Sequence, residues 1–304
     1  MSPRVSFVIT TKNRPKGLRA AVASVLSSLP QDGEVIVVDD ASQPPAADAL
    51  ADMNDPRVML HVNPGPHGPS AARNFGVRQT RAPLLMFLDD DDMLVEGYPL
   101  RVLDRISSLP KDCTFGFSAS FHREQDGSQT KFAPVSPEGI LGNETPLKFR
   151  SAGLGMGFWI TRAAFDDAGG LDEDIDVNED TEFSARLAAS GYRCYCDQTP
   201  GVILTHDPVR STSDQSSITK SATARARFLG FEYILTKHQD FLRKHSKYRR
   251  KIFTRVVKYR VRAGDMSNYL RFCAQHRPVS DVAIYLIPSV LWLGLSKLLR
   301  RKRQ

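Results

Sequence analysis

Cysteine is scarce in this chain: 304 residues include four, Cys113, Cys194, Cys196 and Cys273, and no Cys-x-x-Cys pair. Four cysteines at this length are too few for a disulfide-stabilised scaffold, so reduced and partly buried thiols are expected. The N-terminus runs directly into an apolar segment, without the charged region and long apolar stretch of a secretory signal. Both features predict a protein of the cytosol or of the cytosolic side of a membrane.

Several sequence signatures are also missing, and each absence narrows the function. No Gly-x-Gly-x-x-Gly fingerprint of dinucleotide binding is present. No 12-residue EF-hand pattern occurs, which argues against a calcium sensor. No glycine-rich phosphate loop with basic residues lies near the N-terminus, which argues against a nucleotidyltransferase. A content of 41% hydrophobic and 25% charged residues is typical of a globular protein and excludes a disordered chain, a collagen and a coiled coil.

The net charge of +7 is the sum of two unlike parts. Residues 220–304 hold 21 Lys and Arg against 4 Asp and Glu, whereas residues 1–219 hold 20 basic and 30 acidic residues. From about residue 216 onward the apolar spacing is helical, with no convincing strand. We therefore predict two domains, at residues 1–215 and 216–304.

The first part alternates between two hydrophobic patterns. Apolar periodicity predicts helices over residues 15–29 and 71–80, and a loop with a short helix over 41–57. Short runs rich in β-branched residues predict buried strands at 5–10, 34–38, 58–62 and 84–88. This alternation predicts an α/β fold with a parallel sheet covered by helices on both faces. Ligands of such sheets bind beyond the carboxyl ends of the strands, which here fall at Thr10, Asp39 and Asp89.

Four consecutive aspartates, Asp89 to Asp92, follow the fourth predicted strand directly. Like charges crowded at one strand end repel one another, and a divalent cation relieves the repulsion because hard cations prefer carboxylate oxygens. A solvated turn with Asp as a helix cap is the alternative, but such a turn needs one or two of these residues. The run therefore favours a metal site, and a site with few protein ligands suits Mg²⁺ or Mn²⁺.

A second acidic cluster is Asn178-Glu179-Asp180-Thr181-Glu182, at the start of a helical pattern. Acidic residues in a first helical turn also occur simply because they compensate the helix dipole, and this alternative stays open for Glu179 and Glu182. Upstream lie Gly153, Gly155 and Gly157, followed by a strand-like segment at 158–161. Repeated glycines of this kind indicate a backbone that approaches a ligand closely.

Taken together, these motifs resemble the inverting nucleotide-sugar glycosyltransferases of family 2, which have the GT-A fold. The matching segments are VSFVITTKNRP, VIVVDDAS (35–42), AARNFGV (71–77), FLDDDD (87–92), GGLDE (169–173) and NEDTEFSARL (178–187). The resemblance covers about residues 4–210, and the set is specific although each motif alone is weak. It implies a Rossmann-like, mostly parallel sheet flanked by helices. It also implies metal-dependent transfer of a sugar, expected to come from a UDP-sugar, to a hydroxyl acceptor. The expected setting is cell-surface polysaccharide or glycolipid synthesis, with a saccharide or a lipid-linked molecule as acceptor.

The resemblance also implies roles for individual residues. The catalytic base is expected at Asp180, with Glu179 beside it. Asp39 is expected to face the base of the nucleotide, and Asp40 to support the turn. The metal ligands are expected at Asp89, Asp91 and Asp92, in a register that is ambiguous by one residue, with His206 as a further ligand or else a structural histidine. The residues expected to bind the donor nucleotide are Thr10, Asn13, Arg14, Asp39, Arg73 and Asp90.

The basic C-terminal part has one charge-free stretch, residues 282–296. As a helix these 15 residues would span about 22 Å, short of a bilayer core of about 30 Å, and Pro288 interrupts them. The segment is therefore expected to form an interfacial helix with flanking basic residues. Such a helix would attach the protein peripherally to the cytoplasmic face of an anionic membrane. An ordinary helix packed on the catalytic domain is the alternative.

Two other functions remain open from the residues alone. The chain could be a catalytically inactive protein that binds polyanions or a membrane surface, or it could be a nucleotidyltransferase. A net charge of +17 in residues 220–304 suits polyanions in general. The aromatic interleaving of a nucleic-acid stacking platform is missing, so no nucleic-acid partner is expected.

Overall fold

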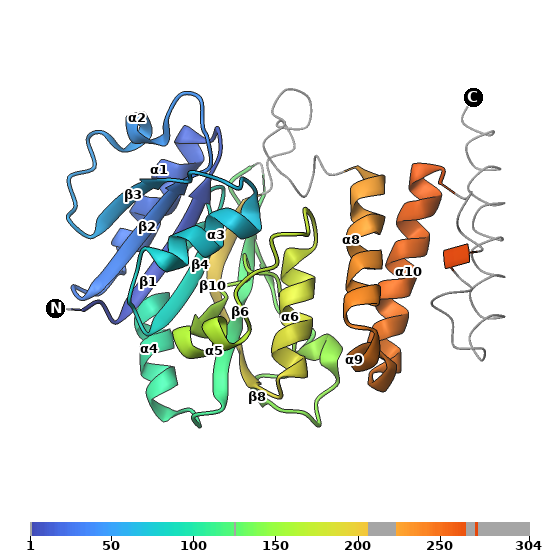
Figure 1. Ribbon diagram of the computed structural model, residues 1–304. Coiled ribbons are helices and arrows are strands. Elements are labelled where there is room, and N and C mark those ends of the chain that lie inside the picture. The colour runs from blue at the N-terminus through green and yellow to red at the C-terminus, as the bar shows by residue number, and fades with distance from the viewer. Residues whose placement is uncertain (1, 125, 206–222, 266–270, 273–304) are drawn as a thin grey trace. The chain divides into compact units, whose positions relative to one another are not determined.

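Figure 1 shows a computed structural model of the chain, which describes residues 2–124, 126–205, 223–265 and 271–272. The chain divides into two compact units, Met1–Ser217 and Ile218–Gln304, which are described separately. His206 and the segment 282–296 lie outside the described residues. The roles predicted for the two domains and for these segments stay predictions.

The first unit is built on a ten-stranded sheet with the main strand order β3-β2-β1-β4-β9-β6-β10-β5. Its first half is parallel and contains all four strands expected from the sequence. These are β1 (Val5–Thr11), β2 (Gly33–Asp39), β3 (Val58–Val62) and β4 (Leu84–Asp89). The predicted α/β fold is thereby confirmed.

The second half of the sheet is mixed. The short strand β9 (Trp159–Thr161) pairs antiparallel with β4 and with β6 (Cys113–Arg123), and β6 pairs parallel with β10 (Arg193–Thr205). The remaining strands form short antiparallel ladders: β5 (Met93–Leu94), β7 (Gln129–Phe132) and β8 (Gly139–Leu141). The sequence analysis predicts β9, whereas β6 and β10 are not among its predicted strands.

Helices cover both faces of the sheet (Figure 1). One face packs against α1 (Pro15–Leu26), α2 (Ala46–Leu50) and α4 (Tyr98–Ser108). The other face packs against α3 (Pro69–Arg78), α5 (Arg162–Asp167) and α6 (Glu179–Ala189). Because alternate residues of β1 enter cores on opposite faces, with Phe7 on one and Val8 on the other, the strands read as continuous apolar runs.

Helix α1 is shorter than the predicted helix over 15–29. It ends at Leu26, and the following Ser27 and Ser28 donate backbone hydrogen bonds to the carbonyls of Ala23 and Val25. Leu29 nevertheless remains buried in the same core, which explains why it fits the helical spacing. The three cysteines of this unit, Cys113, Cys194 and Cys196, are free and buried, and burial raises the pKa of Cys194 to about 12.

The described part of the second unit includes three helices, α8 (Ala224–Lys237), α9 (Gln239–Lys244) and α10 (Ser246–Ala263). Thr223 caps α8 by accepting a hydrogen bond from the backbone N–H of Ala226, and α10 ends at Gly264 in the left-handed conformation. Helices α8 and α10 pack together, and Phe231 stacks on Tyr259 between them. Among the described residues, none of the helices is both long enough and apolar enough to cross a membrane.

Candidate active site

The carboxyl ends of three parallel strands lie side by side, as the sequence predicts. Thr10 of β1 pairs with Val38 of β2 on one side and with Asp89 of β4 on the other, and Thr11 pairs with Asp39. Thr10 is half-buried, whereas Thr11 is buried and its hydroxyl donates a 2.7 Å hydrogen bond to Asp90 Oδ2. The first strand is therefore linked to the aspartate run through Thr11, a residue that the motif comparison does not single out.

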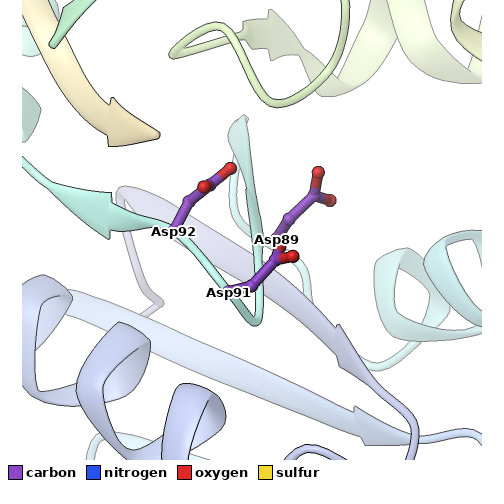
Figure 2. A group of neighbouring side chains, drawn as sticks. All are labelled: Asp89, Asp91 and Asp92. Atoms are coloured by element: carbon purple, nitrogen blue, oxygen red, sulfur yellow. The ribbon is translucent and has the colours of Figure 1, made fainter. Parts of the chain in front are cut away.

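Three of the four consecutive aspartates converge (Figure 2). Asp89, Asp91 and Asp92 each offer one carboxylate oxygen, and these atoms lie within 4.8 Å of one another. The turn is closed by a hydrogen bond from the backbone N–H of Asp92 to the carbonyl of Asp89, and Asp92 Oδ1 accepts from the backbone N–H of Thr205. Three convergent carboxylates are a donor set that fits Mg²⁺ or Mn²⁺.

Asp90 is not among the three converging carboxylates and has other partners. Its oxygens accept from Thr11 and from Arg14, whose Nη1 lies 2.6 Å from Asp90 Oδ1 and 3.0 Å from Asp91 Oδ2. Arg14 is almost completely buried, with 9% of its side chain exposed. The guanidinium thus offsets part of the negative charge of the run, through Asp90 and Asp91.

Burial changes the acidity of two carboxylates of the run, Asp92 and Asp90. Burial, reinforced by the charges of Asp89 and Asp91, raises the pKa of Asp92 to about 8. Burial also raises the pKa of Asp90, to about 6, although Arg14 and Thr11 act against it. Without a cation, Asp92 therefore favours a bound proton near neutral pH. That preference for neutralisation is what a cation-binding site requires.

Arg73 joins the aspartate run to the second acidic cluster. Its Nη2 lies 2.7 Å from Asp89 Oδ1, and its Nη1 lies 3.0 Å from Glu179 Oε1. Burial disfavours the charge of Arg73, but Asp89 and Glu179 outweigh it and raise the arginine pKa overall. Burial likewise raises the pKa of Glu179, against the opposing effect of Arg73. The guanidinium is thus a buried bridge between two carboxylates that lie 90 residues apart in the sequence.

Asp180 lies in the first turn of α6, beside Glu179. One of its oxygens, Oδ1, accepts from the backbone N–H of Thr181 at 2.6 Å and from the Thr181 hydroxyl at 3.2 Å. Glu182, by contrast, is completely buried and pairs with Arg186 one turn along the same helix. Of the acidic residues in this motif, Glu182 therefore has a structural role.

The glycine-rich segment before β9 lies against both acidic clusters. A Cβ atom on Gly153 would lie 3.1 Å from Asp180 Oδ2, and one on Gly155 would lie 3.1 Å from Asp89 Oδ2. These glycines leave room for the carboxylates, which agrees with the close backbone approach expected from the sequence. Residues 153–155 therefore form one wall that the two clusters share.

The loops after β1 and β2 are tied to each other. Asn13, with a φ of 60°, donates its backbone N–H to Ser42 Oγ, and its Oδ1 accepts from the backbone N–H of Gln43. Asp39 is buried, and its two oxygens accept from the backbone N–H groups of Ser42 and Ala46, each at 2.8 Å. Asp39 therefore makes turn contacts of the kind expected of Asp40. Its contact with a nucleotide base stays a prediction.

Asp40 links the loops after β2 and β3. Its Oδ1 lies 2.8 Å from Asn63 Nδ2 and 2.9 Å from His67 Nδ1, and its Oδ2 accepts from the backbone N–H of Gly68 at 3.0 Å. Residues 63–70 (NPGPHGPS) are rich in glycine and proline and predict only a loop, with no signal for the contacts with Asp40. The structure thus adds Asn63 and His67 to the edge of the site.

The chain is similar in sequence to known proteins. The family model described as Glycosyl transferase family 2 matches residues 6–158. The succinoglycan biosynthesis protein ExoU of Rhizobium meliloti (strain 1021) is 30% identical over 200 residues, 62% of this chain and 58% of ExoU. A Campylobacter jejuni protein named GalNAc(5)-diNAcBac-PP-undecaprenol beta-1,3-glucosyltransferase is 28% identical over 135 residues, 42% of this chain and 41% of that protein. The chain thus matches less than two thirds of the length of either relative.

Among solved structures, the S. aureus TarS fragment 1-349 in complex with UDP-GlcNAc superposes with a TM-score of 0.62 at 14% identity. The superposition covers 92% of this chain and 77% of the TarS fragment. At this identity the likeness concerns the fold.

Proposed function

We propose the function from one premise, which is that the chain belongs to glycosyl transferase family 2. The proposed reaction is transfer of a sugar from a nucleotide-sugar donor to an acceptor hydroxyl, with inversion, assisted by Mg²⁺ or Mn²⁺. The observation that carries the proposal is the meeting of two acidic clusters at one sheet edge, joined by Arg73. Direct displacement needs such a pair, because one cluster can serve the leaving group and the other the incoming hydroxyl.

Asp89, Asp91 and Asp92 are the residues that would hold the cation, since their oxygens already converge. When bound, the cation supplies neutralisation of the charge that develops on the diphosphate leaving group. Asp90 and Arg14 hold the shape of the run, and through it the positions of the three ligands. His206 remains a predicted further ligand.

The donor nucleotide is proposed to lie along the ends of β1 and β2, over Thr10, Asn13 and Asp39. Asp39 is held in one position by two backbone N–H groups, and Asn13 joins the two loops that border this edge. A UDP-sugar is the proposed donor. The TarS complex with UDP-GlcNAc supports this choice, because its fold is shared over 92% of the present chain.

Asp180 is proposed as the base that takes the proton from the acceptor hydroxyl. Its Oδ1 is fixed by Thr181, and its Oδ2 is the oxygen turned toward Gly153 in the wall shared with the cation site. One carboxylate suffices for a single displacement with inversion, and holding the reactants in line supplies much of the rate. Glu179 is proposed as a positioning residue, because Arg73 engages it.

The biological setting is also a proposal. ExoU is named for succinoglycan biosynthesis, and the name of the C. jejuni relative specifies an acceptor linked to undecaprenol. These names support synthesis of a cell-surface polysaccharide or glycolipid, on a saccharide or lipid-linked acceptor. A peripheral position on the cytoplasmic face of an anionic membrane would suit such an acceptor, with residues 216–304 as the membrane-associating part.

The test is nucleoside diphosphate release from a panel of nucleotide sugars with Mg²⁺ or Mn²⁺. Asp180→Asn is expected to abolish transfer and to leave donor affinity unchanged, because only the base is altered. Asp176→Asn, an exposed acidic residue just before α6, is the matched control and should retain activity. Loss of donor binding in Asp180→Asn would show that the base is misassigned. No release from any donor by the folded protein would overturn the proposed function, and pyrophosphate release from a nucleoside triphosphate would favour a nucleotidyltransferase.

A further inference from the structure

Helix α10 of the second unit has an extreme charge content. Its 18 residues include eight Lys and Arg and no Asp or Glu. Cations spaced four residues apart, such as Lys247 with Lys251 and Lys258 with Arg262, face each other along a helix and destabilise it when they have the same sign. A solvated helix that needed only solubility would carry charges of both signs. The uniform sign makes this helix a strongly positive element, of the kind that suits an anionic partner.

Five of the eight cations of α10 are exposed and share one face of the helix. The buried face consists of Tyr248, Ile252, Val256, Val257 and Arg260, which pack in the core of the unit. The exposed cations are Lys247, Arg250, Lys251, Lys258 and Arg262, here called the α10 stripe. Their spacing of three, four and seven residues places them on one side of the helix over a length of about 22 Å.

The acidic residues in the described part of this unit pair with arginines outside the stripe. Glu232 and Asp265 lie 2.6 Å and 3.6 Å from the buried Arg260, and Asp240 lies 3.2 Å from Arg243 of α9. Within the stripe, Lys258 and Arg262 lie over the ring of Tyr259, at 5.7 Å and 5.6 Å from its centre. Long side chains that rest on an aromatic ring keep their charged ends directed outward.

The shape and chemistry of the stripe favour a lipid surface over a nucleic acid. The exposed positions between the cations hold no aromatic side chain, and Thr254 is the exposed residue at the centre of the stripe. Base-stacking platforms require exposed aromatic rings, whereas a planar array of anionic headgroups requires only cations arranged along a line. Each Lys or Arg near such a surface strengthens binding by a factor of about five.

We propose that the α10 stripe is the surface through which the protein lies on an anionic lipid bilayer. The inference rests on the proposed function, in which the acceptor lies at a membrane. It differs from the expected contribution of residues 282–296, because the stripe acts through charge and that segment through apolar contact. Binding through the stripe is accordingly expected to fall steeply with salt, whereas an apolar contribution persists.

The test is co-sedimentation of the full chain with vesicles of phosphatidylglycerol and phosphatidylcholine, compared with phosphatidylcholine alone. The variant Lys247→Gln/Lys251→Gln/Lys258→Gln is expected to lose about 100-fold in partitioning to the anionic vesicles, at about fivefold per charge. The matched control is Lys16→Gln/Lys111→Gln/Lys131→Gln, which removes the same charge from exposed sites of the first unit. The control is expected to bind as the unaltered chain does, and circular dichroism checks the helix content of both variants.

Equal losses in both variants would attribute binding to net charge and overturn the proposal, as would no loss in the stripe variant. A stripe variant that keeps vesicle binding but loses binding to a single-stranded oligonucleotide would assign the surface to nucleic acid instead. Nucleoside diphosphate release in the absence of vesicles separates this test from the proposed function. Both variants are expected to retain it, and its absence from the unaltered chain would count against catalysis without bearing on the stripe.

Discussion

Arg73 offers the sharpest test of how the two acidic clusters are held together. In Arg73→Gln, the carboxylates of Asp89 and Glu179 lose the cation that joins them, at 2.7 Å and 3.0 Å respectively. Removing one partner of a buried ion pair costs about 3–5 kcal/mol, because an uncompensated charge remains in the interior. For a unit of this size, that cost corresponds to a fall in melting temperature of about 6–20 °C.

The measurement is thermal unfolding of the cation-free protein, monitored by near-ultraviolet circular dichroism. Arg78→Gln is the matched control, because Arg78 is an exposed arginine on the same helix, α3. Its substitution should change stability by no more than about 0.5 kcal/mol. The double variant Arg73→Gln/Glu179→Gln is expected to recover about 1–3 kcal/mol relative to additivity, since it removes the stranded carboxylate as well.

A melting temperature for Arg73→Gln within the range of the Arg78→Gln control would refute this reasoning. The bridge would then contribute no net stability, and Arg73 would be free to serve the donor directly, as the family resemblance implies. A large loss of stability without coupling to Glu179 would indicate that packing of the arginine side chain, rather than its two ion pairs, is responsible.

Two further predictions concern the cation site and its wall. The pKa of Asp92 in the folded protein, about 8, lies above the value of 3.8 expected in the unfolded chain. The protonated Asp92 side chain therefore contributes to the free energy of unfolding below about pH 4, and this contribution is lost as the pH rises toward 8. Asp92→Asn should therefore show a smaller loss of stability between pH 5 and pH 8 in chelator, measured by urea unfolding, and an unchanged slope would contradict this. Gly155→Ala places a Cβ atom 3.1 Å from Asp89 Oδ2 and is expected to weaken Mn²⁺ binding several-fold in a titration followed by electron paramagnetic resonance. Gly153→Ala places a Cβ atom 3.1 Å from Asp180 Oδ2, so this variant should lower turnover rather than Mn²⁺ affinity. Equal effects of the two variants on Mn²⁺ affinity would argue against separate roles for the two glycines.

The first half of the sheet is readable from the sequence because its strands are buried on both faces. β1, β2 and β4 each contain a short run of buried apolar residues, at 7–9, 35–38 and 84–88, which marks them in the sequence. β6 has no continuous apolar run, because Gly116, Ser118 and Ser120 alternate with the apolar residues of the strand. Gly116 is required by a distant neighbour: a Cβ atom there would lie 2.5 Å from the indole ring of Trp159. A requirement set by tertiary packing is not encoded in local periodicity.

The candidate active site likewise has features that the sequence predicts and features that it does not. That carboxylates gather at one sheet edge follows from where the parallel strands end, and the motifs identify which carboxylates they are. Which three of the four aspartates converge depends on the turn after β4, where Asp90 is taken up by Thr11 and Arg14. The bridge made by Arg73 depends on a glutamate 106 residues away in the sequence, which no local pattern specifies.

The balance of charge in the site suggests an order of binding. The six carboxylates at residues 89–92, 179 and 180 face two buried arginines, Arg14 and Arg73, each already engaged by two of them. In the proposed reaction a nucleoside diphosphate brings further negative charge to this edge, and like charges at close range repel strongly where solvent is excluded. Burial and neighbouring carboxylates already favour a proton on Asp92 near neutral pH, and a divalent cation would displace that proton. The cation is therefore expected to bind before the donor or together with it, because it converts a site that repels phosphate into one that attracts it.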